Sequence, residues 1–247
     1  KLVSPEGNHV TEQENKSGSE VKKCHQSDET TWSYLFVHHN KVKGMEAQLT
    51  KDGRTYFVQK HQVFQEDALE RAKRVKLIIF DVDGVLTDGG IYIGADGELF
   101  KPFFCRDGLG ITLAHRAGLK TAIITGRQSE HLRYRAKELH ITEVYQGNLD
   151  KREAYRDLKA KLGLADEEIA YFSDDLVDLP IMGQVGFPAA VGDAVQEVRE
   201  AAVLQSDYPG GHGAVRQLIE FILKAQGKWQ GLVAGFQAKT SMDGLAQ

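Results

Sequence analysis

Short apolar runs alternate with longer amphipathic stretches along the chain from residue 75 onward. Each run is rich in β-branched, leucine or aromatic residues and is bounded by turn residues, which is typical of a buried parallel strand. Strands are predicted over residues 75–80, 120–125, 143–145, 168–172 and 185–190, and helices over residues 129–139, 151–162, 194–202 and 213–226. Strands that alternate with helices form parallel βαβ units. The pattern therefore predicts an α/β fold with a doubly wound, Rossmann-like parallel sheet.

One stretch interrupts this alternation. Residues 91–104 read I-Y-I-G-A-D-G-E-L-F-K-P-F-F, in which two β-rich arms flank a glycine-containing turn, as in a β-hairpin. The stretch follows the first predicted strand, so we expect it to project over the carboxyl end of that strand. Its four aromatic residues are many for an exposed hairpin and predict a buried contact with another subunit.

The two ends of the chain have a different composition from the middle. Residues 1–64 are mostly polar and are predicted to be a disordered extension, with one possible hairpin over residues 48–59 around Asp52-Gly53. A helix over residues 66–73 leads into a single domain over residues 65–226. Residues 227–247 contain several glycines and are predicted to be a flexible tail, although Trp229 and Phe236 are too apolar for an idle linker.

Composition excludes some classes of function. The net charge of -4 gives no basic footprint for nucleic acid. No apolar run is long enough to span a bilayer, and no signal peptide is evident, so we expect no membrane partner and a cytoplasmic location. Cys24 lies in a polar segment and Cys105 in the predicted domain, which makes a structural disulfide between them an unfavoured interpretation.

Polar residues collect where the predicted strands end. Asp81 and Asp83 come directly after the first strand, and two carboxylates this close repel each other unless a cation or a shared proton holds them. Alone, they fit a solvated acidic turn as well as a ligand site. Parallel strands present their carboxyl ends at one edge of a sheet, where open α/β folds bind ligands. The polar residues that follow the later strands can therefore join them there: Thr125 and Gly126, Lys151, and the acidic group Asp174, Asp175 and Asp178.

This ordered set of motifs resembles the haloacid dehalogenase superfamily of phosphotransferases over about residues 75–225. The resemblance implies that Asp81 attacks phosphorus and that Asp83 moves protons to and from the reacting oxygens. It implies a Mg²⁺ site made by Asp81, the Asp83 backbone carbonyl and Asp174. Thr125 and Gly126 would bind phosphoryl oxygens, and Lys151 would neutralise their charge. Asp175 and Asp178 would support the site or cap the following helix.

Longer motifs resemble the 3-deoxy-D-manno-octulosonate (KDO) 8-phosphate phosphatase family within that superfamily. They include F-D-V-D-G-V-L-T-D-G-G, F-C-R-D-G-L-G-I, I-I-T-G-R, Y-Q-G-N-L-D-K and S-D-D-L-V-D-L-P. The resemblance implies a small sugar acid phosphate as substrate, a role in lipopolysaccharide synthesis, and a homotetramer with a hairpin over residues 91–104 in place of a large cap. It also implies that the tail reaches a neighbouring site. The substrate contacts that it implies are Asp83, Phe104, Cys105, Arg106, Asp107, Gly108, Thr125, Gly126, Arg127, Arg135 and Lys151.

The sequence departs from the family pattern at two positions. Ser173 stands where a glycine is usual, and Thr112 stands where a basic residue is usual. Other functions also stay open. A nine-carbon sialic-type acid 9-phosphate could be the substrate of the same chemistry, and a non-catalytic assembly domain could share the fold. Such assembly domains usually lack the nucleophile or the lysine, whereas Asp81 and Lys151 are both present.

Overall fold

The computed structural model describes residues 67–238 with their side chains, and the backbone of six strands between residues 10 and 65. The chain divides into two compact units, Lys1–Ala68 and Leu69–Gln247. The strands of the first unit are β1 (Val10–Glu14), β2 (Glu20–His25), β3 (Thr31–Leu35), β4 (Ala47–Lys51), β5 (Arg54–Gln59) and β6 (Gln62–Gln65). Each pairs antiparallel with the next.

The structure confirms one of the two predictions for the first unit and differs from the other. The hairpin predicted around Asp52-Gly53 is confirmed by the pairing of β4 with β5, in which Lys51 lies opposite Arg54. The disorder predicted for residues 1–64 differs from the strand assignment in these six stretches. The segments between the strands lie outside the described residues.

The second unit holds the predicted parallel sheet. Its strand order is β14-β13-β12-β7-β10-β11, and all neighbouring pairs are parallel. The strands are β7 (Leu77–Phe80), β10 (Lys120–Ile124), β11 (Glu143–Tyr145), β12 (Ile169–Ser173), β13 (Phe187–Ala190) and β14 (Leu204–Gln205). The helices are α1 (Ala68–Arg74), α2 (Cys105–Arg116), α3 (Glu130–Glu138), α4 (Lys151–Leu162), α5 (Leu179–Met182), α6 (Gln196–Ala201), α7 (Ala214–Ala225) and α8 (Trp229–Gln237). The predicted α/β fold class is confirmed.

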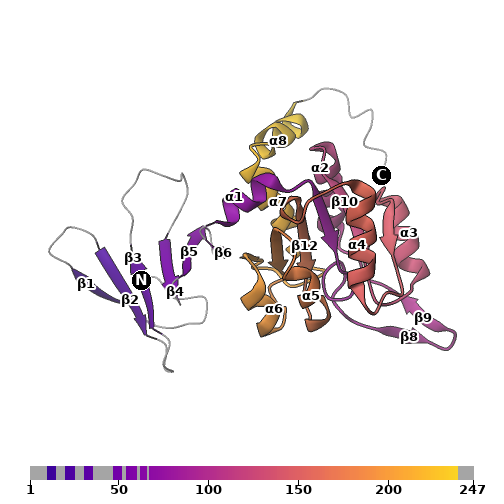
Figure 1. The fold of residues 1–247 in the computed structure, drawn as a ribbon, viewed down its shortest axis with the longest axis horizontal. Coiled ribbons are helices and arrows are strands. Elements are labelled where there is room, and N and C mark those ends of the chain that lie inside the picture. The colour runs from indigo at the N-terminus through magenta and orange to yellow at the C-terminus, as the bar shows by residue number, and fades with distance from the viewer. Residues whose placement is uncertain are drawn as a thin grey trace. The chain divides into compact units, whose positions relative to one another are not determined.

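Helices cover both faces of this sheet. Helices α4, α5 and α6 lie on one face and α2 and α7 on the other (Figure 1). The central strand β7 is completely buried, and the ring of Phe80 packs edge-on against that of Phe172 in β12, with 5.4 Å between centroids. An apolar run buried on both faces is the usual reason for a central parallel strand. The core therefore fixes the strand that directly precedes Asp81.

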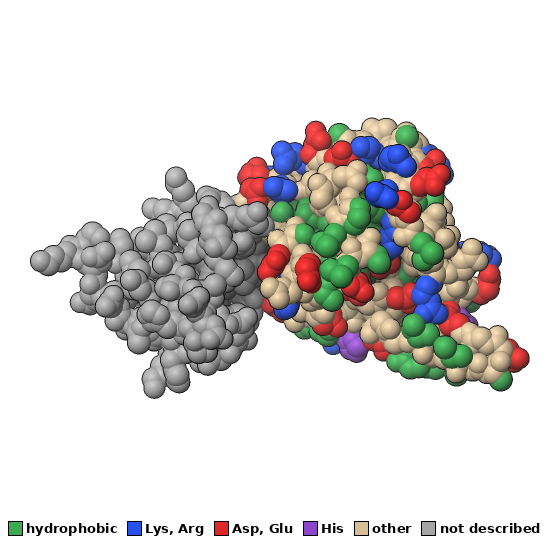
Figure 2. Space-filling model, turned by 60° about the horizontal axis from the view of Figure 1, so that its bottom comes forward, with side chains coloured by type: hydrophobic (Ala, Val, Ile, Leu, Met, Phe, Trp, Pro, Cys, Tyr) green, Lys and Arg blue, Asp and Glu red, His purple; other side chains and the backbone are tan. Residues whose placement is uncertain are grey.

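The predicted hairpin forms from β8 (Tyr92–Gly94) and β9 (Gly97–Phe100). The rings of Tyr92 and Phe100 stack with centroids 4.4 Å apart. Three further apolar side chains, those of Ile91, Ile93 and Leu99, are 56%, 74% and 61% exposed. Figure 2 shows apolar side chains along this projecting part of the molecule at the lower right. The hairpin is thus apolar without being covered by the described residues.

The start of the tail forms a helix, α8, which differs from the prediction of a flexible segment. Tertiary contacts offset the cost of its glycines. Trp229 lies against the cations of Arg216 and Lys224, which are 5.2 and 5.4 Å from its ring centroid. Lys228 Nζ donates to the carbonyl of Ala117 at 2.9 Å. Residues 239–247 lie outside the described residues, and no helix in the described part of the chain is long and apolar enough to cross a membrane.

Candidate active site

The site is built at the carboxyl end of β7. The N–H of Asp81 still donates to Phe172 O, at 3.1 Å, so the sheet fixes the backbone where the first aspartate leaves it. The turn that follows depends on Gly84, whose φ of +87° favours glycine. A Cβ at this position would also overlap the Asp174 carboxylate. The D-x-D-G turn and the acidic end of β12 are therefore in direct contact.

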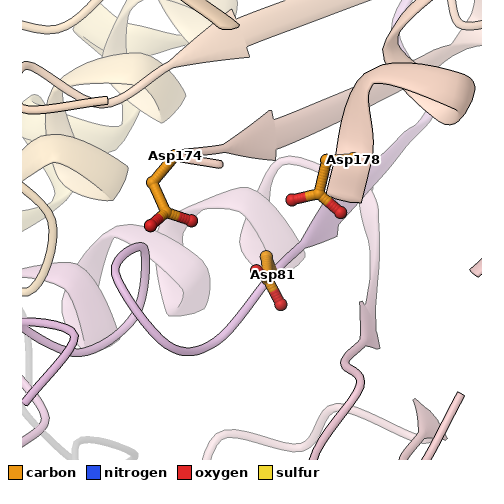
Figure 3. Close-up of side chains that lie close together, drawn as sticks. All are labelled: Asp81, Asp174 and Asp178. Atoms are coloured by element: carbon orange, nitrogen blue, oxygen red, sulfur yellow. The ribbon is translucent and has the colours of Figure 1, made fainter. Parts of the chain in front are cut away.

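Three carboxylates converge here. Asp81, Asp174 and Asp178 each offer an oxygen, and these oxygens lie within 4.8 Å of one another (Figure 3). Burial raises the pKa of Asp81 to about 6 and that of Asp174 to about 7. Among the described side chains, Asp174 Oδ1 is one of the few buried polar atoms without a hydrogen-bond partner. A buried carboxylate oxygen that lacks a donor and lies beside two other carboxylates suits a hard divalent cation such as Mg²⁺.

A buried lysine faces the acidic group from the start of α4. Lys151 Nζ lies 2.8 Å from Asp81 Oδ1 and 2.7 Å from Asp178 Oδ1. Burial alone lowers the pKa of this ammonium, but the two carboxylates outweigh it and hold the pKa above its usual value. The predicted lysine and the predicted first aspartate are thus in contact, and the lysine is held charged.

Asp178 is more central than the supporting role predicted for it. Its side chain is completely buried, and it accepts hydrogen bonds from Tyr171 OH at 2.7 Å and Ser173 Oγ at 2.8 Å. Ser173, which departs from the family pattern, therefore donates a hydrogen bond to the Asp178 carboxylate of the site. Asp175 accepts from the N–H of Leu176 at 2.7 Å and caps the short turn that follows.

A second charged cluster joins Asp83 to the hairpin. Lys101 Nζ donates to Asp83 Oδ1 and lies 3.2 Å from Glu98 Oε1. Arg127 reaches both acids, with Nε 3.8 Å from Asp83 Oδ2 and Nη2 3.4 Å from Glu98 Oε1. Sequence reasoning predicted Asp83 and Arg127 but missed Lys101 and Glu98. The only sequence signal for these two was that charged residues occur among the aromatic and aliphatic residues of the hairpin segment.

Thr125 lies where the phosphate site was predicted, directly after β10. Its side chain is buried, and its Oγ1 accepts from the N–H of Arg127 at 3.4 Å. Its backbone is held by the strand pairing, because its N–H donates to Tyr145 O at 2.9 Å. A Cβ added to Gly126 would lie at ordinary contact distance from the Leu149 side chain and the Asn148 carbonyl. The strand pairing and the hydrogen bond to Arg127 thus fix the position of Thr125 after β10.

The F-C-R-D-G segment opens α2, and its members have different surroundings. Asp107 is buried, and it accepts from the N–H groups of Gly213 at 3.2 Å and Arg216 at 2.8 Å, which fastens α2 to the start of α7. Phe104 lies 5.7 Å from the guanidinium of Arg106. Cys105 is exposed and has a free thiol. In this structure Asp107 is a packing residue.

Arg135 lies in the contact between α3 and α2. Its Nη1 is 2.7 Å from Glu138, its guanidinium is 6.0 Å from the Phe103 ring, and a Cβ on Gly108 would overlap it. Its Nε is buried without a partner among the described residues. Thr112, the second departure from the family pattern, bonds within its own helix to Gly108 O at 3.1 Å. The structure therefore brings Asp81, Lys151 and Asp174 together, with Asp83 and Arg127 in the hairpin cluster, and it leaves Arg135 in a packing contact.

Comparison with known proteins agrees with this geometry. Residues 129–218 match the family model described as haloacid dehalogenase-like hydrolase. A 3-deoxy-D-manno-octulosonate 8-phosphate phosphatase of Yersinia pestis is 45% identical over 166 residues, which are 67% of this chain and 89% of the relative. The corresponding protein of Escherichia coli strain K12 is 44% identical over 162 residues, covering 66% of this chain and 86% of that protein.

Solved structures give the same result. A crystal structure of the phosphatase from Moraxella catarrhalis in complex with a magnesium ion, a phosphate ion and a KDO molecule superposes with a TM-score of 0.68. It is 40% identical and covers 69% of this chain and 98% of that chain. The relatives are matched over most of their own length, and residues 129–218, which match the family model, lie in the second unit. The chain belongs to the 3-deoxy-D-manno-octulosonate 8-phosphate phosphatase family of haloacid dehalogenase-like hydrolases.

Proposed function

We propose that this protein is a Mg²⁺-dependent phosphatase that hydrolyses 3-deoxy-D-manno-octulosonate 8-phosphate to KDO and phosphate. The observation that carries this proposal is the Asp81 carboxylate at the end of β7, held by Lys151 Nζ at 2.8 Å within a group of three acids. Phosphate monoesters hydrolyse extremely slowly in water, so a large reduction of the barrier is required. A fixed nucleophile among charged groups supplies positioning and charge neutralisation together.

The first step transfers the phosphoryl group to the enzyme. A carboxylate oxygen of Asp81 attacks phosphorus, the bond from phosphorus to the sugar oxygen breaks, and a protonated Asp83 gives its proton to the leaving oxygen. Lys151 holds Asp81 in place through the ion pair between Lys151 Nζ and Asp81 Oδ1, and it offsets negative charge on the phosphoryl oxygens. The buried Thr125 hydroxyl can donate to one of those oxygens.

The second step returns the enzyme to its starting state. Asp83, now a carboxylate, takes a proton from a water molecule whose oxygen attacks phosphorus of the Asp81 phosphate. The bond between phosphorus and the Asp81 oxygen breaks, and inorganic phosphate leaves. One residue thus serves first as acid and then as base, which requires that its carboxyl group stay in one position through both steps.

The residues that would hold Mg²⁺ are Asp81, Asp174 and the Asp83 backbone carbonyl, with Asp178 beside them. The unpartnered Asp174 Oδ1 fits this role. When bound, the ion supplies positive charge that relieves repulsion among the carboxylates and polarises the phosphoryl group.

Specificity for a sugar acid is proposed to come from cations around the mouth of the site. Arg127 is 39% exposed and shares Asp83 and Glu98 at 3.8 and 3.4 Å, so it can turn toward a substrate carboxylate. Arg106 and Arg135 stay candidates for the same task, together with the backbone of residues 104–108. A nine-carbon acid 9-phosphate is the second candidate substrate, and the length of the sugar separates the two.

Further parts of the proposal concern the assembly and the setting. The exposed apolar hairpin supports an interface between subunits, and the family resemblance suggests a homotetramer in which hairpins of neighbouring subunits pack together. The tail, residues 227–247, is proposed to reach a neighbouring site. A role in lipopolysaccharide synthesis is proposed from the substrate, since KDO is a component of that glycolipid, and a cytoplasmic location is proposed with it.

A phosphate-release assay tests the function. Purified protein with Mg²⁺ is given KDO 8-phosphate, a nine-carbon sialic-type acid 9-phosphate and ordinary hexose phosphates at equal concentrations. We expect the highest kcat/KM for KDO 8-phosphate, and we expect no phosphate release from any substrate in excess chelator. A higher kcat/KM for the nine-carbon acid 9-phosphate would make that compound the substrate in place of KDO 8-phosphate. If no phosphate is released from any sugar acid phosphate, the proposed function is wrong.

A further inference from the structure

A buried lysine on the hairpin side of the site has no role in the chemistry described so far. Lys101 directly follows β9, and only 3% of its side chain is exposed. A buried ammonium group is costly unless carboxylates or other acceptors surround it. Its partners are Asp83 and Glu98, and the hydrogen bond to Asp83 Oδ1 is the closer of the two contacts. The hairpin therefore delivers a fixed positive charge to the residue that moves the protons.

Lys101 and Arg127 contact the same two acids but are held differently. Arg127 is 39% exposed and lies 3.8 Å from Asp83, which leaves it able to move toward a ligand. Lys101 is enclosed and has no path to solvent comparable with that of Arg127. Both cations therefore lie beside the same two acids. Arg127 is therefore suited to contact a ligand, and Lys101 is suited to hold Asp83.

The lysine is itself anchored to the body of the domain. Its partner Glu98 accepts a hydrogen bond from the Ser129 hydroxyl. Ser129 caps α3, because its Oγ also accepts from the N–H of Leu132 at 3.3 Å. Contacts therefore run from Asp83 through Lys101 and Glu98 to a capped helix. A side chain held by such a series loses little freedom when the reaction begins, which is how positioning accelerates a step.

We infer that Lys101 is a positioning residue that fixes the Asp83 carboxyl group and decides which of its oxygens carries the transferred proton. An ammonium group only donates hydrogen bonds, so Asp83 Oδ1 must accept from it. The proton that goes to the leaving sugar oxygen is then carried on Oδ2 and leaves from Oδ2. In the second step the same oxygen takes the proton from water. The inference rests on the proposed function, in which Asp83 is the acid and base.

The test compares two substrates in Lys101→Met. The sugar alkoxide needs a proton as it leaves, whereas the nitrophenolate of p-nitrophenyl phosphate does not. For both substrates kcat/KM reports steps up to the first phosphoryl transfer, so slow hydrolysis of the Asp81 phosphate does not obscure it. We expect kcat/KM for KDO 8-phosphate to fall by about 100-fold, within the usual contribution of a general acid, and that for p-nitrophenyl phosphate to change far less. In an Asp83→Asn background, Lys101→Met should cause no further loss on KDO 8-phosphate.

Controls make the result specific. Lys161→Met removes an exposed lysine, which pairs with Glu143 at 2.8 Å, and should leave both activities unchanged. Lys101→Gln keeps a donor for Asp83 and should retain more activity on KDO 8-phosphate than Lys101→Met. If Lys101→Met does not melt cooperatively, and so is not folded, Lys101→Gln replaces it in the comparison of the two substrates. Equal losses on both substrates, or a further loss in the Asp83→Asn background, would overturn the inference.

The two proposals fail in different ways. If the wild-type enzyme releases phosphate from p-nitrophenyl phosphate but not from KDO 8-phosphate, the proposed substrate is wrong. The comparison then uses whichever alkyl phosphate the enzyme hydrolyses. If KDO 8-phosphate is hydrolysed and both activities fall together in Lys101→Met, the positioning role is wrong while the function stands.

Discussion

Asp81 is subject to two opposing requirements at the residue scale. It must be ionised to attack phosphorus, yet burial raises its pKa to about 6, against the attraction of Lys151. The neighbouring Asp174 has its pKa raised further, to about 7, by burial and by the charges of Asp81 and Asp178. A bound cation and the ammonium of Lys151 favour the ionised forms. The three neighbouring carboxylates are therefore stabilised by a bound metal ion, and without the ion their repulsion destabilises the folded state.

Asp81→Asn tests the nucleophile. The amide is nearly the same size but is a poor nucleophile, so we expect kcat to fall by at least about 1,000-fold while the melting temperature stays close to that of the wild type. Phosphate release and thermal melting measure the two effects. Activity within tenfold of the wild type would show that Asp81 does not attack phosphorus.

Metal binding should change the dependence of stability on pH. In the metal-free protein the raised pKa values of Asp81 and Asp174 mean that the folded state binds their protons more tightly than the unfolded state. Their protonation therefore stabilises the fold at pH values below about 4, and this stabilisation is lost as the pH rises through 6 and 7. Mg²⁺ binds the ionised forms, so its stabilising effect should increase over the same range.

Melting curves with Mg²⁺ and with excess chelator, at about pH 5 and about pH 8, measure this effect. A ligand at a hundredfold excess over its Kd stabilises by about 2.7 kcal/mol, so the difference at the higher pH is measurable. Asp174→Asn should remove most of it, whereas Glu130→Gln, at an exposed acid paired with Arg133, should not. A Mg²⁺ effect that is larger at the lower pH would contradict the assignment of these carboxylates.

At the scale of elements, the sequence predicts the strands that carry the chemistry better than the contacts between them. Strand β7 is a buried apolar run that ends in charge, so its position and the site at its end follow from pattern alone. Strand β14 has two residues and α5 has four, which is too short for a periodic pattern. The contact of Lys101 with Asp83 joins residues far apart in sequence. It depends on how the hairpin folds back, which hydrophobic patterning does not encode.

The turn after β7 gives a prediction at this scale. Gly84→Ala should abolish Mg²⁺ stabilisation and lower kcat by at least about tenfold, because the added methyl group overlaps the Asp174 carboxylate. The positive φ alone costs about 1–2 kcal/mol for a residue other than glycine. Gly118→Ala is the matched control, since Gly118 has a φ of +80° and nothing within 4 Å of the added atom. Similar losses of Mg²⁺ stabilisation in both variants would mean that backbone strain, and not contact with Asp174, is responsible.

At the scale of the whole molecule, the active site lies in the second unit, as do residues 129–218, which match the family model. The Yersinia pestis relative matches 67% of this chain but 89% of its own length. Within the second unit the hairpin has exposed apolar side chains, and Ile93 is the most exposed of them at 74%. A surface of this kind usually marks an interface.

Ile93→Lys tests the proposed tetramer. A charge placed between packed hairpins should be costly to bury, so we expect smaller species in light scattering and a lower kcat if the hairpins order the site. Tyr134→Lys alters another exposed large side chain, on α3 and 77% exposed, and should leave the assembly unchanged. A wild-type monomer at micromolar concentration would contradict the tetramer, and an intact tetramer in Ile93→Lys would contradict the role of the hairpin.

Direct trapping of the phosphorylated enzyme tests the central claim, that Asp81 receives the phosphoryl group of KDO 8-phosphate. Enzyme and Mg²⁺ are mixed with substrate labelled at phosphorus and quenched in acid on the millisecond scale, and the label measures enzyme-bound and free phosphate. In a parallel sample borohydride reduces the aspartyl phosphate to homoserine with release of phosphate, and the peptide that contains homoserine is mapped. We expect a transient modification at Asp81 that appears before free phosphate and is absent in excess chelator. Labelled phosphate released in a burst-free reaction with no modified peptide, or a modification at Asp83 in place of Asp81, would contradict it.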